Sequence, residues 1–385
     1  MPALSARLLE EISDIRKRLH CFPELSFQEF KTTELIKNVL NSWGLKFSPF
    51  KNLQTGGYCD VGIGNIIAFR SDIDALPILE NEKHEIRSQI PGKMHACGHD
   101  FHTAIGLGLL KFFSDNPHLL NGKLRVIFQP AEEAAPGGAE QVVKEKIWEN
   151  VRAILTTHVI PGEQSGKFIL SRGAVQASST SFKIEIKGPG GHTSKPFETV
   201  DLIRVVGEYI TQLQGYLEQK TDVRDTVAFA FGAINGGSEH NIIPQSINLR
   251  GTIRTLSNTV LAQSLEFIRQ FSAAFEKLYR VKLKLLFPTT CPATINDDRL
   301  SEYFLTFMTA RGKEGDVLLP EKPSMGADDF AFYLEKVPGL YLGIGGGGEG
   351  ALHSGELLLE ENLLEPAIQN MTDFILFLYE KQNME

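Results

Sequence analysis

Residues 123–133, KLRVIFQPAEE, pass from an apolar, strand-like run into two adjacent glutamates. Two other runs are built in the same way, since NIIAFR (65–70) leads into the polar SDID and RAILTT (152–157) leads into a histidine. Segments with helical periodicity stand between them at 102–114 and 137–146. Strands that alternate with helices pair in parallel, so this half of the chain predicts an α/β fold with a mostly parallel sheet flanked by helices.

Side chains of the kinds that bind divalent metals directly follow these strands in the sequence and also occur in two other segments. Open α/β sheets bind ligands beyond the carboxyl ends of their strands, so these positions favour a site. The candidate ligands come from segments far apart in the sequence: Cys97, His99, Glu132, Glu133, His158 and His353. The two glutamates matter most, because one can bind metal while its neighbour accepts a proton. Metal-assisted hydrolysis needs that division of roles.

The middle of the chain follows a different pattern. Its segments run in the order β-α-β-β-α-β, which is typical of a ferredoxin-like α+β domain. We expect its strands at 181–188, 226–234, 246–254 and 281–287, and its helices at 199–219 and 258–279. The α/β pattern then resumes with a strand at 339–344. The sequence therefore predicts a metal-binding domain over 1–177 and 290–385, interrupted by an inserted domain over 178–289.

Composition places the chain among ordinary globular proteins. Of its 385 residues 42% are hydrophobic and 22% charged, and the net charge of −8 argues against nucleic acid as a partner. No run approaches the roughly 18 apolar residues of a membrane span, and the N-terminal segment has helical periodicity rather than the form of a signal peptide. Four irregularly spaced cysteines give no disulfide framework. We expect a cytoplasmic protein without a membrane or nucleic-acid partner.

Each motif taken alone has a simpler interpretation. The Cys-Gly-His run at 97–99 could be a buried structural cysteine beside a capping histidine, or a Cys/His nucleophilic pair. Adjacent glutamates are usually a solvated pair on a helix surface. The nucleophilic interpretation ranks lower, because the glutamates and the two distant histidines would then have no role. We interpret His95 as structural and His102 as a residue at the start of a helix.

Other polar residues suit supporting roles. Asp72 and Asp74 are two residues apart, so in an extended segment they face the same side, and one could support a metal-bound histidine. Asp100 could accept a hydrogen bond from a ligating imidazole. In the inserted domain, His192 follows two glycines and could donate to a developing oxyanion. Arg254 could clamp a substrate carboxylate or pair on the surface.

Together these motifs resemble one family along nearly the whole chain. It is the two-metal amidohydrolase family of aminoacylases, hippurate hydrolases, N-acetyl-diaminopimelate deacetylases and auxin-conjugate hydrolases. The resemblance is carried by RKRLHCFPELSFQE, RSDIDALPI, MHACGHDFHTA, FQPAEEAAPGGA, GPGGHTSKP, EHNIIPQ, GADDFAFYL and LHSGE. These matches are specific for the family and not for the substrate. Phe101 is a departure, because relatives usually carry a small residue there, and it could reshape substrate choice beside the cleft.

The resemblance implies a role for each matching residue. Cys97 lies between the two metals. The remaining ligands are His99, Glu133, His158 and His353. Glu132 matches the general acid/base, and His192 matches a histidine that reaches the active site of a neighbouring subunit. Asn241 and Arg254 match positions near the carboxylate or amide of the substrate, and the inserted domain matches a lid or dimerisation domain.

We therefore expect a metal-dependent amidohydrolase, a homodimer, that splits the amide bond of N-acyl amino acids. Glu132 removes a proton from the attacking water and returns it to the departing amine. Two divalent ions per subunit are expected, Zn or Mn, with Ni or Co also compatible with a thiolate ligand. The alternatives are a metal-dependent dipeptidase or carboxypeptidase and, in a different class, a non-catalytic metal- or ligand-binding protein.

Overall fold

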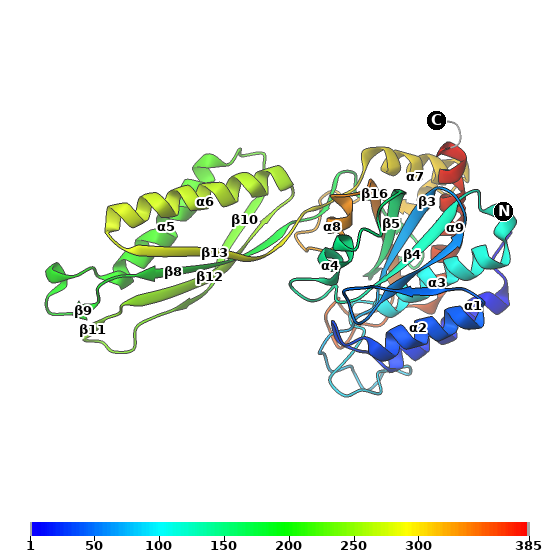
Figure 1. Ribbon diagram of the computed structural model, residues 1–385, viewed down its shortest axis with the longest axis horizontal. Coiled ribbons are helices and arrows are strands. Elements are labelled where there is room, and N and C mark those ends of the chain that lie inside the picture. The colour runs from blue at the N-terminus through cyan, green and yellow to red at the C-terminus, as the bar shows by residue number, and fades with distance from the viewer. Residues whose placement is uncertain (1, 383–385) are drawn as a thin grey trace. The chain divides into compact units, whose positions relative to one another are not determined.

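The structure, a computed structural model, describes residues 2–382 (Figure 1). The chain divides into two compact units. The first unit comprises the residues up to 175 together with 295–322 and those from 329 onward, and the second comprises 176–294 with 323–328. The second unit is slightly longer than the insertion expected over 178–289. It also takes in the short segment 323–328, which the sequence pattern assigns to the metal-binding domain.

An eight-stranded sheet forms the centre of the first unit, in the order β1-β2-β4-β3-β5-β16-β6-β15. The strands are β1 (Phe47–Pro49), β2 (Gly57–Gly62), β3 (Ile66–Asp72), β4 (Lys123–Gln129), β5 (Val151–Pro161), β6 (Phe168–Ile169), β15 (Val317–Leu318) and β16 (Gly339–Gly347). β3 pairs in parallel with β4 and β5, and β16 pairs in parallel with β5. The expected mostly parallel α/β sheet is thus confirmed. The antiparallel edge of β1 and β2 was not predicted, because GGYCDVGIG (56–64) has the composition of a loop.

Helices flank this sheet (Figure 1). They are α1 (Ala6–Cys21), α2 (Phe30–Ser42), α3 (His99–Asp115), α4 (Gly138–Lys144), α7 (Asp298–Ala310), α8 (Ala331–Leu334) and α9 (Leu364–Gln382). α3 begins earlier than the helix expected at 102–114. The reason is Gly98, whose φ of 77° lies in the left-handed region that favours glycine. This turn places His99 at the N-terminus of the helix.

The central strand β3 leads directly to the candidate site. All of its residues are buried, as expected for a parallel strand that is covered on both faces. Arg70 therefore needs buried partners, and its Nη1 and Nη2 donate to Asp72 Oδ2 at 2.6 Å and Asp329 Oδ1 at 2.8 Å. Asp72 Oδ1 is also 2.6 Å from His102 Nδ1. This buried polar network fixes the end of β3.

The second unit has its own antiparallel sheet, in the order β10-β12-β8-β13. Its elements are β8 (Ser179–Lys187), β9 (Gly191–His192), α5 (Leu202–Lys220), β10 (Val227–Asn235), β11 (Ile242–Ile243), β12 (Ser246–Thr255), α6 (Asn258–Tyr279) and β13 (Lys282–Cys291). α5 and α6 lie over the same face of the sheet (Figure 1), and Tyr209 packs edge to face on Phe275 between them. The main elements follow the β-α-β-β-α-β order predicted from the sequence. Two further short strands, β7 (Ala174–Gln176) and β14 (Thr294–Ile295), pair with each other.

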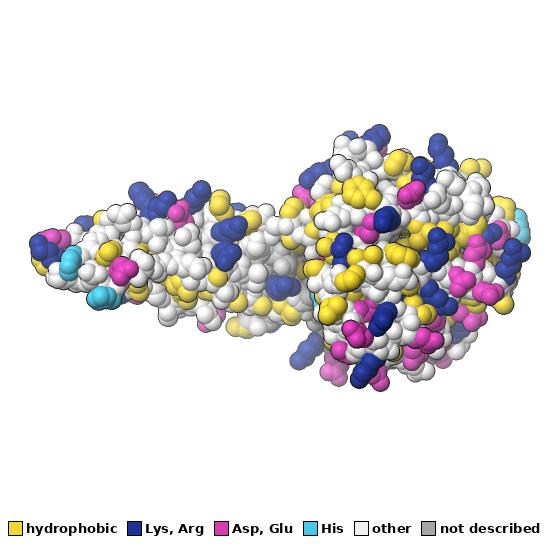
Figure 2. All heavy atoms as spheres, turned by 90° about the horizontal axis from the view of Figure 1, so that it is seen from below, with side chains coloured by type: hydrophobic (Ala, Val, Ile, Leu, Met, Phe, Trp, Pro, Cys, Tyr) yellow, Lys and Arg dark blue, Asp and Glu magenta, His cyan; other side chains and the backbone are white. Residues whose placement is uncertain are grey.

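The surface and the cysteines show ordinary features. On the face seen in Figure 2, Lys and Arg side chains are interspersed with Asp and Glu side chains. No disulfide joins any of the four cysteines in the part of the chain that the structure describes. Within residues 2–382, no helix combines the length and the apolar character needed to cross a membrane.

Candidate metal centre

Six candidate ligand residues gather at the carboxyl ends of the central strands. Cys97 immediately precedes the α3 turn and His99 begins the helix. Glu132 and Glu133 follow β4. His158 lies within β5, and His353 lies in the loop after β16. Their ligand atoms form overlapping groups in which all atoms lie within 4.8 Å of one another, so the structure brings together every metal ligand predicted from the sequence.

The first of these groups consists of Cys97, His99 and His158. Cys97 Sγ is 3.4 Å from His158 Nε2. His158 Nδ1 is 2.8 Å from the main-chain oxygen of Val159, and His99 Nδ1 is 3.0 Å from the main-chain oxygen of Asp74. An imidazole that donates from Nδ1 to a carbonyl has its Nε2 lone pair available for a metal. Both histidines are therefore oriented as ligands.

A second group consists of Cys97, Glu133 and His353. Glu133 Oε1 is 3.1 Å from His353 Nε2. The main-chain NH of His353 donates to the oxygen of Ala96 at 2.7 Å, which ties its loop to the segment that carries Cys97. Cys97 thus belongs to both groups, the position expected for a thiolate between two metals.

The two adjacent glutamates both face this cluster. Glu132 Oε2 and Glu133 Oε1 are each 3.9 Å from His99 Nε2. Their side chains are only 11% and 10% exposed, respectively. This burial rules out the simpler interpretation of a solvated pair.

The chemistry of the cluster fits divalent cations. His99 Nε2 is buried and lacks a hydrogen-bond partner among residues 2–382. Buried polar atoms nearly always have a partner, which can be an ion or an ordered water. Thiolate, imidazole and carboxylate are the ligands that Zn²⁺ and similar transition metals prefer. A bound cation would give the unpartnered nitrogen of His99 its partner.

The electrostatics of the cluster favour positive charge at His99 and a protonated thiol at Cys97. Burial alone would lower the pKa of His99, but the charge of Asp72 and the hydrogen bond to Asp74 contribute to raising it well above its ordinary value. Burial raises the pKa of the Cys97 thiol, so without a cation the sulfur stays protonated. A coordinated thiol is ionised by its metal, whereas a nucleophilic cysteine needs a low pKa in the free protein. The nucleophilic alternative is disfavoured.

Asp72 and Asp74 support the cluster in different ways. Asp74 Oδ1 is 3.2 Å from His99 Nδ1, the contact expected of a residue that orients a ligand. Asp72 is 3.7 Å from His99 Nε2, and its Oδ1 accepts from His102 Nδ1 instead. His102 Nε2 accepts from the main-chain NH of Val159 at 3.0 Å. Because both of its ring nitrogens are occupied, His102 is no metal ligand.

Asp100 does not make the contact expected of it. Among the described residues its hydrogen bonds join Oδ2 to His20 Nδ1 at 2.9 Å and to Arg16 Nη1 at 3.4 Å, and neither partner is a candidate ligand. The cause is the helix, since successive residues of α3 point in different directions. Burial lowers the pKa of His20, yet Asp100 and Glu80 together raise it to about 9. Asp100 therefore belongs to a separate buried ion pair.

Two neighbours of the cluster face the protein interior. His95 is buried, and burial lowers its pKa to about 4, in keeping with a structural role. Phe101 is 2% exposed and lies in the main hydrophobic core, where its ring is 4.8 Å from the guanidinium of Arg16. Phe101 also lines a pocket together with His95 and Asp100, and its influence on substrate choice stays a prediction.

His192 and Asn241 line one groove of the second unit, about 800 Å³ in volume. His192 is exposed, and its Nδ1 accepts hydrogen bonds from the main-chain NH of Ser194 at 3.1 Å and from the hydroxyl of Ser194 at 2.9 Å. A neutral imidazole that accepts at Nδ1 carries its proton on Nε2. His192 therefore presents an N–H donor, the form that an oxyanion requires.

Arg254 and Asn241 are both held by main-chain contacts within the second unit. Arg254 Nη1 donates to the oxygen of Met325 at 2.8 Å. The main-chain oxygen of Asn241 accepts from the NH of Thr193 at 3.2 Å. These contacts fix where the two residues lie, and their part in substrate binding stays a prediction.

Two further partners in the site could not be recognised from the sequence. The carbonyl of Val159 holds His158, and the hydroxyl of Ser26 donates to Asp74 Oδ2 at 2.7 Å. A main-chain carbonyl leaves no mark in a sequence, and a single serine has no distinctive spacing. The motif that contains Ser26 carried part of the resemblance, and this was the only available signal.

A cation-binding cluster beside a second buried glutamate, at the strand ends of an α/β sheet, defines a metal-dependent hydrolase. The chain belongs to the family described as peptidase family M20/M25/M40, whose family model matches residues 68–376. The amidohydrolase family expected from the motifs is thereby confirmed.

Curated relatives match nearly the whole chain. N-acetyldiaminopimelate deacetylase of Bacillus subtilis is 34% identical, over 95% of this chain and 98% of the relative. N-acetyl-L-cysteine deacetylase of the same organism is 35% identical, over 94% of this chain and 87% of the relative. Thermostable carboxypeptidase 1 of Saccharolobus solfataricus is 30% identical, over 92% of each chain. Among solved structures, a dinuclear metal binding peptidase of the M20 family from Bacillus subtilis superposes with a TM-score of 0.85 at 30% identity, over 98% of this chain and 99% of that chain.

Proposed function

We propose that this protein hydrolyses the amide bond of N-acyl amino acids with two divalent cations bound. The observation that carries the proposal is the division of roles between two adjacent glutamates. Glu133 contacts His353 Nε2 through its carboxylate, and its main-chain NH donates to Asp74 Oδ2 at 3.0 Å. Glu132 directs a second carboxylate toward the same cluster. One carboxylate then serves as a ligand while the other serves as the base.

Five residues would hold the cations: Cys97, His99, Glu133, His158 and His353. The solved dinuclear relative supports a count of two. When bound, the cations supply Lewis-acid polarisation of the scissile carbonyl and acidify water. The thiolate and imidazoles favour Zn²⁺, Ni²⁺ or Co²⁺, whereas the carboxylates also suit Mn²⁺.

The side chains of the protein carry the proton transfers. Glu132 takes the proton from the attacking water and gives it to the departing amine. His192 Nε2–H donates to the developing oxyanion, and Arg254 with Asn241 binds the carboxylate or amide of the substrate. Since these last three residues belong to the second unit, we propose that this unit acts as a lid.

A substrate screen tests this function. The purified, metal-reconstituted protein is offered N-acetyl- and N-benzoyl-amino acids, N-acetyldiaminopimelate, and matched dipeptides. Release of the free amino acid from N-acyl substrates is expected, because two of the relatives are named for deacetylation of such compounds. Cation binding without turnover of any amide would place the protein in the non-catalytic class.

The second candidate is a metal-dependent carboxypeptidase or dipeptidase, favoured by the Saccharolobus relative. A dipeptidase would turn over substrates with a free amino terminus faster than the acylated ones. A carboxypeptidase would release the last residue from longer peptides. The same screen therefore separates the candidates through their kcat/KM values on acylated and free-amine substrates of identical sequence.

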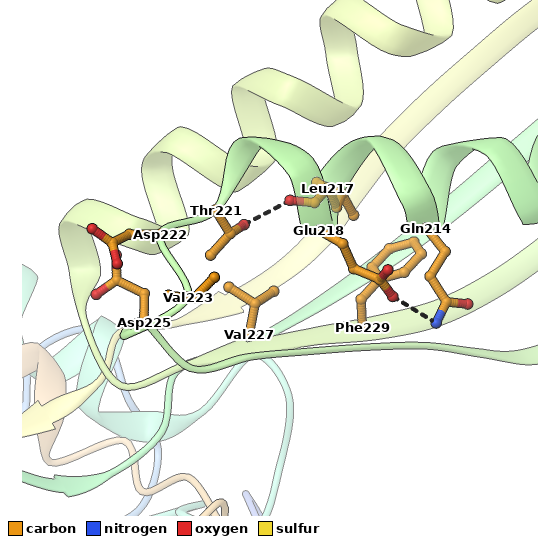
Figure 3. A pocket seen from close by; sticks show the side chains of 9 residues that line it. All are labelled: Gln214, Leu217, Glu218, Thr221, Asp222, Val223, Asp225, Val227 and Phe229. Carbon is orange, nitrogen blue, oxygen red and sulfur yellow. Dashed lines mark hydrogen bonds between the residues drawn. The ribbon is translucent and has the colours of Figure 1, made fainter.

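We also propose a homodimer that pairs along β10. This strand, VAFAFGAIN, stands at an edge of the second sheet and carries no charge. The opposite edge strand, β13, contains Lys282, Lys284 and Pro288, which are typical of edges that avoid pairing. Beside β10 a hollow is lined by Leu217 of α5 and Val227 of β10 (Figure 3). An uncharged, apolar edge strand is a template for pairing with a second copy.

Lysine substitution at each edge tests the dimer. Ala230→Lys places a charge on an exposed position of β10 and is expected to yield monomers in sedimentation measurements. Leu286→Lys, at a 47% exposed position of β13, is the matched control and is expected to leave the dimer intact. Monomers from Leu286→Lys and dimers from Ala230→Lys would instead indicate an interface along β13.

Thiol chemistry supports a cytoplasmic location for this protein. Within residues 2–382 none of the cysteines forms a disulfide, and Cys97 is proposed as a ligand. A reducing compartment preserves thiols, whereas oxidation would remove a thiolate ligand. Cell fractionation of the tagged protein checks the location.

A further inference from the structure

Ala131 has an unusual backbone conformation beside the proposed base. Its φ is 55°, in the left-handed region that residues other than glycine rarely adopt. It stands directly before Glu132, so the direction of the Glu132 side chain depends on this turn. Such a conformation persists only when surrounding contacts hold it.

Two hydrogen bonds hold Ala131 in place. Its main-chain NH donates to Glu29 Oε1 at 2.8 Å, and its carbonyl accepts from the NH of Gly138 at 2.8 Å. Gly138 allows the close approach, because a Cβ there would lie 1.8 Å from the oxygen of Pro130. Asp74 holds the NH of Glu133 on the other side of the base. Buried carboxylates therefore fix the main chain on both sides of Glu132.

The side chain of Glu29 does not cap helix α2. Glu29 occupies the N-cap position of α2, yet its side chain makes no capping hydrogen bond there. The carboxylate is fully buried and accepts from the NH groups of Phe27 and Ala131 and, at 2.8 Å, from the hydroxyl of Thr55. A residue that could cap α2 has turned instead toward the loop that carries the base.

We propose that Glu29 is a positioning residue for hydrolysis, which sets the direction of the Glu132 carboxylate by holding the Ala131 NH. The proposal rests on the proposed function of Glu132 as the base. Among residues 2–382, Glu29 forms hydrogen bonds with none of the candidate ligands and does not line the groove of His192, so its effect on turnover passes through the main chain of the loop. A base displaced by about 1 Å can lose about a hundredfold in rate.

Burying the Glu29 carboxylate has a cost in stability. Burial, followed by the nearby charge of Asp74, raises the pKa of Glu29 to about 7. A buried carboxylate of this kind destabilises the folded state at neutral pH unless it is strongly hydrogen bonded. An amide would accept from the same NH groups at lower cost. Glu29→Gln therefore separates the charge of the carboxylate from its hydrogen bonds.

Glu29→Ala and Glu29→Gln test the proposal in the metal-loaded protein. Removing the acceptor in Glu29→Ala is expected to lower kcat about ten- to hundredfold, with KM and metal content unchanged. Glu29→Gln keeps the Oε1 acceptor and is expected to recover most of the rate. The matched control is Glu24→Ala, because Glu24 Oε2 holds Thr32 in the same segment without touching the loop of the base. That control is expected to lower Tm and leave kcat unchanged.

A double variant separates positioning from a general loss of structure. In the Glu132→Gln background, Glu29→Ala should cause no further loss, because residues that act as a unit are not additive. An equal loss in both backgrounds, or an unchanged kcat in Glu29→Ala, overturns the proposal. If Glu29→Ala does not fold, Glu29→Asp replaces it in both comparisons. The aspartate side chain is one methylene shorter, so its carboxylate is withdrawn from the Ala131 NH. Full activity in the single variant Glu132→Gln would overturn the proposed function. An unchanged kcat in Glu29→Ala, with Glu132→Gln inactive, would overturn only the role of Glu29.

Discussion

Glu133 Oε1 lies 3.1 Å from His353 Nε2, although the two residues come from opposite parts of the sequence. They meet because β4 and β16 end at the same edge of the sheet, and each continues into a loop there. The loop of His353 also contacts Ala96, next to Cys97. Ligands from the N-terminal and C-terminal parts of the first unit therefore close one cluster.

Metal removal should consequently destabilise the protein. A cation that binds only the folded state stabilises it by about 2.7 kcal/mol at a hundred times its Kd. EDTA treatment is expected to lower Tm, and added Zn²⁺ or Mn²⁺ should restore it. His353→Ala should reduce this metal-dependent difference in Tm, whereas His118→Ala, outside the cluster, should not. An identical Tm with and without metal would contradict the assignment.

Glu132→Gln should keep both metals and lose most turnover. The amide is nearly isosteric but cannot accept a proton from water at neutral pH, and a general base contributes about two to four orders of magnitude. Metal analysis and kcat measure the two effects. Glu140→Gln, in the nearby helix α4, is the control and should behave as the unaltered protein. If Glu132→Gln remains active, Asp72 is the next carboxylate to examine.

Cys97→Ser should weaken metal binding. A serine hydroxyl stays protonated near neutral pH, whereas a coordinated thiol ionises despite its burial. Metal content after dialysis is the measurement, and Cys21→Ser at the end of α1 is the control. Full metal content and activity in Cys97→Ser would remove the thiol from the site. Activity that survives metal removal but is lost on alkylation of Cys97 would instead revive the nucleophilic alternative.

The fold could be predicted largely because its strands carry a strong pattern. The run that becomes β3 is apolar and ends in acids, and the structure buries every residue of that strand. β1 and β2 escaped prediction because they are short or rich in glycine and owe their conformation to pairing with β4. Strand propensity is weak where tertiary pairing decides.

The candidate site was predictable as a set of residue types and less so as a set of contacts. Cys97 and Glu133 were recognisable from chemistry and motif, and the structure brings them together. The partner of Asp100 was not recognisable, because the direction of a side chain in α3 depends on where the helix begins. Likewise, Glu29 and Ala131 are far apart in the sequence, and no sequence pattern predicts their hydrogen bond.

The raised pKa of Glu29 should be visible in the pH dependence of protein stability. Its pKa is raised from an ordinary 4.5 to about 7 in the folded protein. Between these values the folded state keeps a proton that the unfolded chain has released, so this group lowers stability as pH rises from about 4.5 to about 7. Glu29→Gln carries no charge and removes that effect. In the metal-free protein, the Tm of Glu29→Gln minus that of the unaltered protein should be more positive at pH 8 than at pH 5. A difference that does not change with pH would contradict the raised pKa.

His192 should affect turnover without affecting the metals. Its Nδ1 accepts from Ser194, so Nε2 carries the proton that an oxyanion would receive. Loss of one such donor costs about 2.7–4 kcal/mol, or two to three orders of magnitude in kcat. His192→Ala should show this loss with full metal content, and His240→Ala, an exposed histidine of the same unit, is the control.

Mixing two inactive variants then asks in which subunit His192 acts. If the histidine serves the neighbouring subunit of a dimer, a mixed dimer of His192→Ala and Glu132→Gln holds one site with both residues intact. About a quarter of full activity is then expected at complete exchange, since half of the dimers are mixed and each has one working site of two. If the histidine serves its own chain, every site in the mixture lacks either the donor or the base, and no activity returns. Subunit exchange, followed with two differently tagged variants, must be demonstrated in the same sample. Exchange without recovery would assign His192 to its own active site or to none.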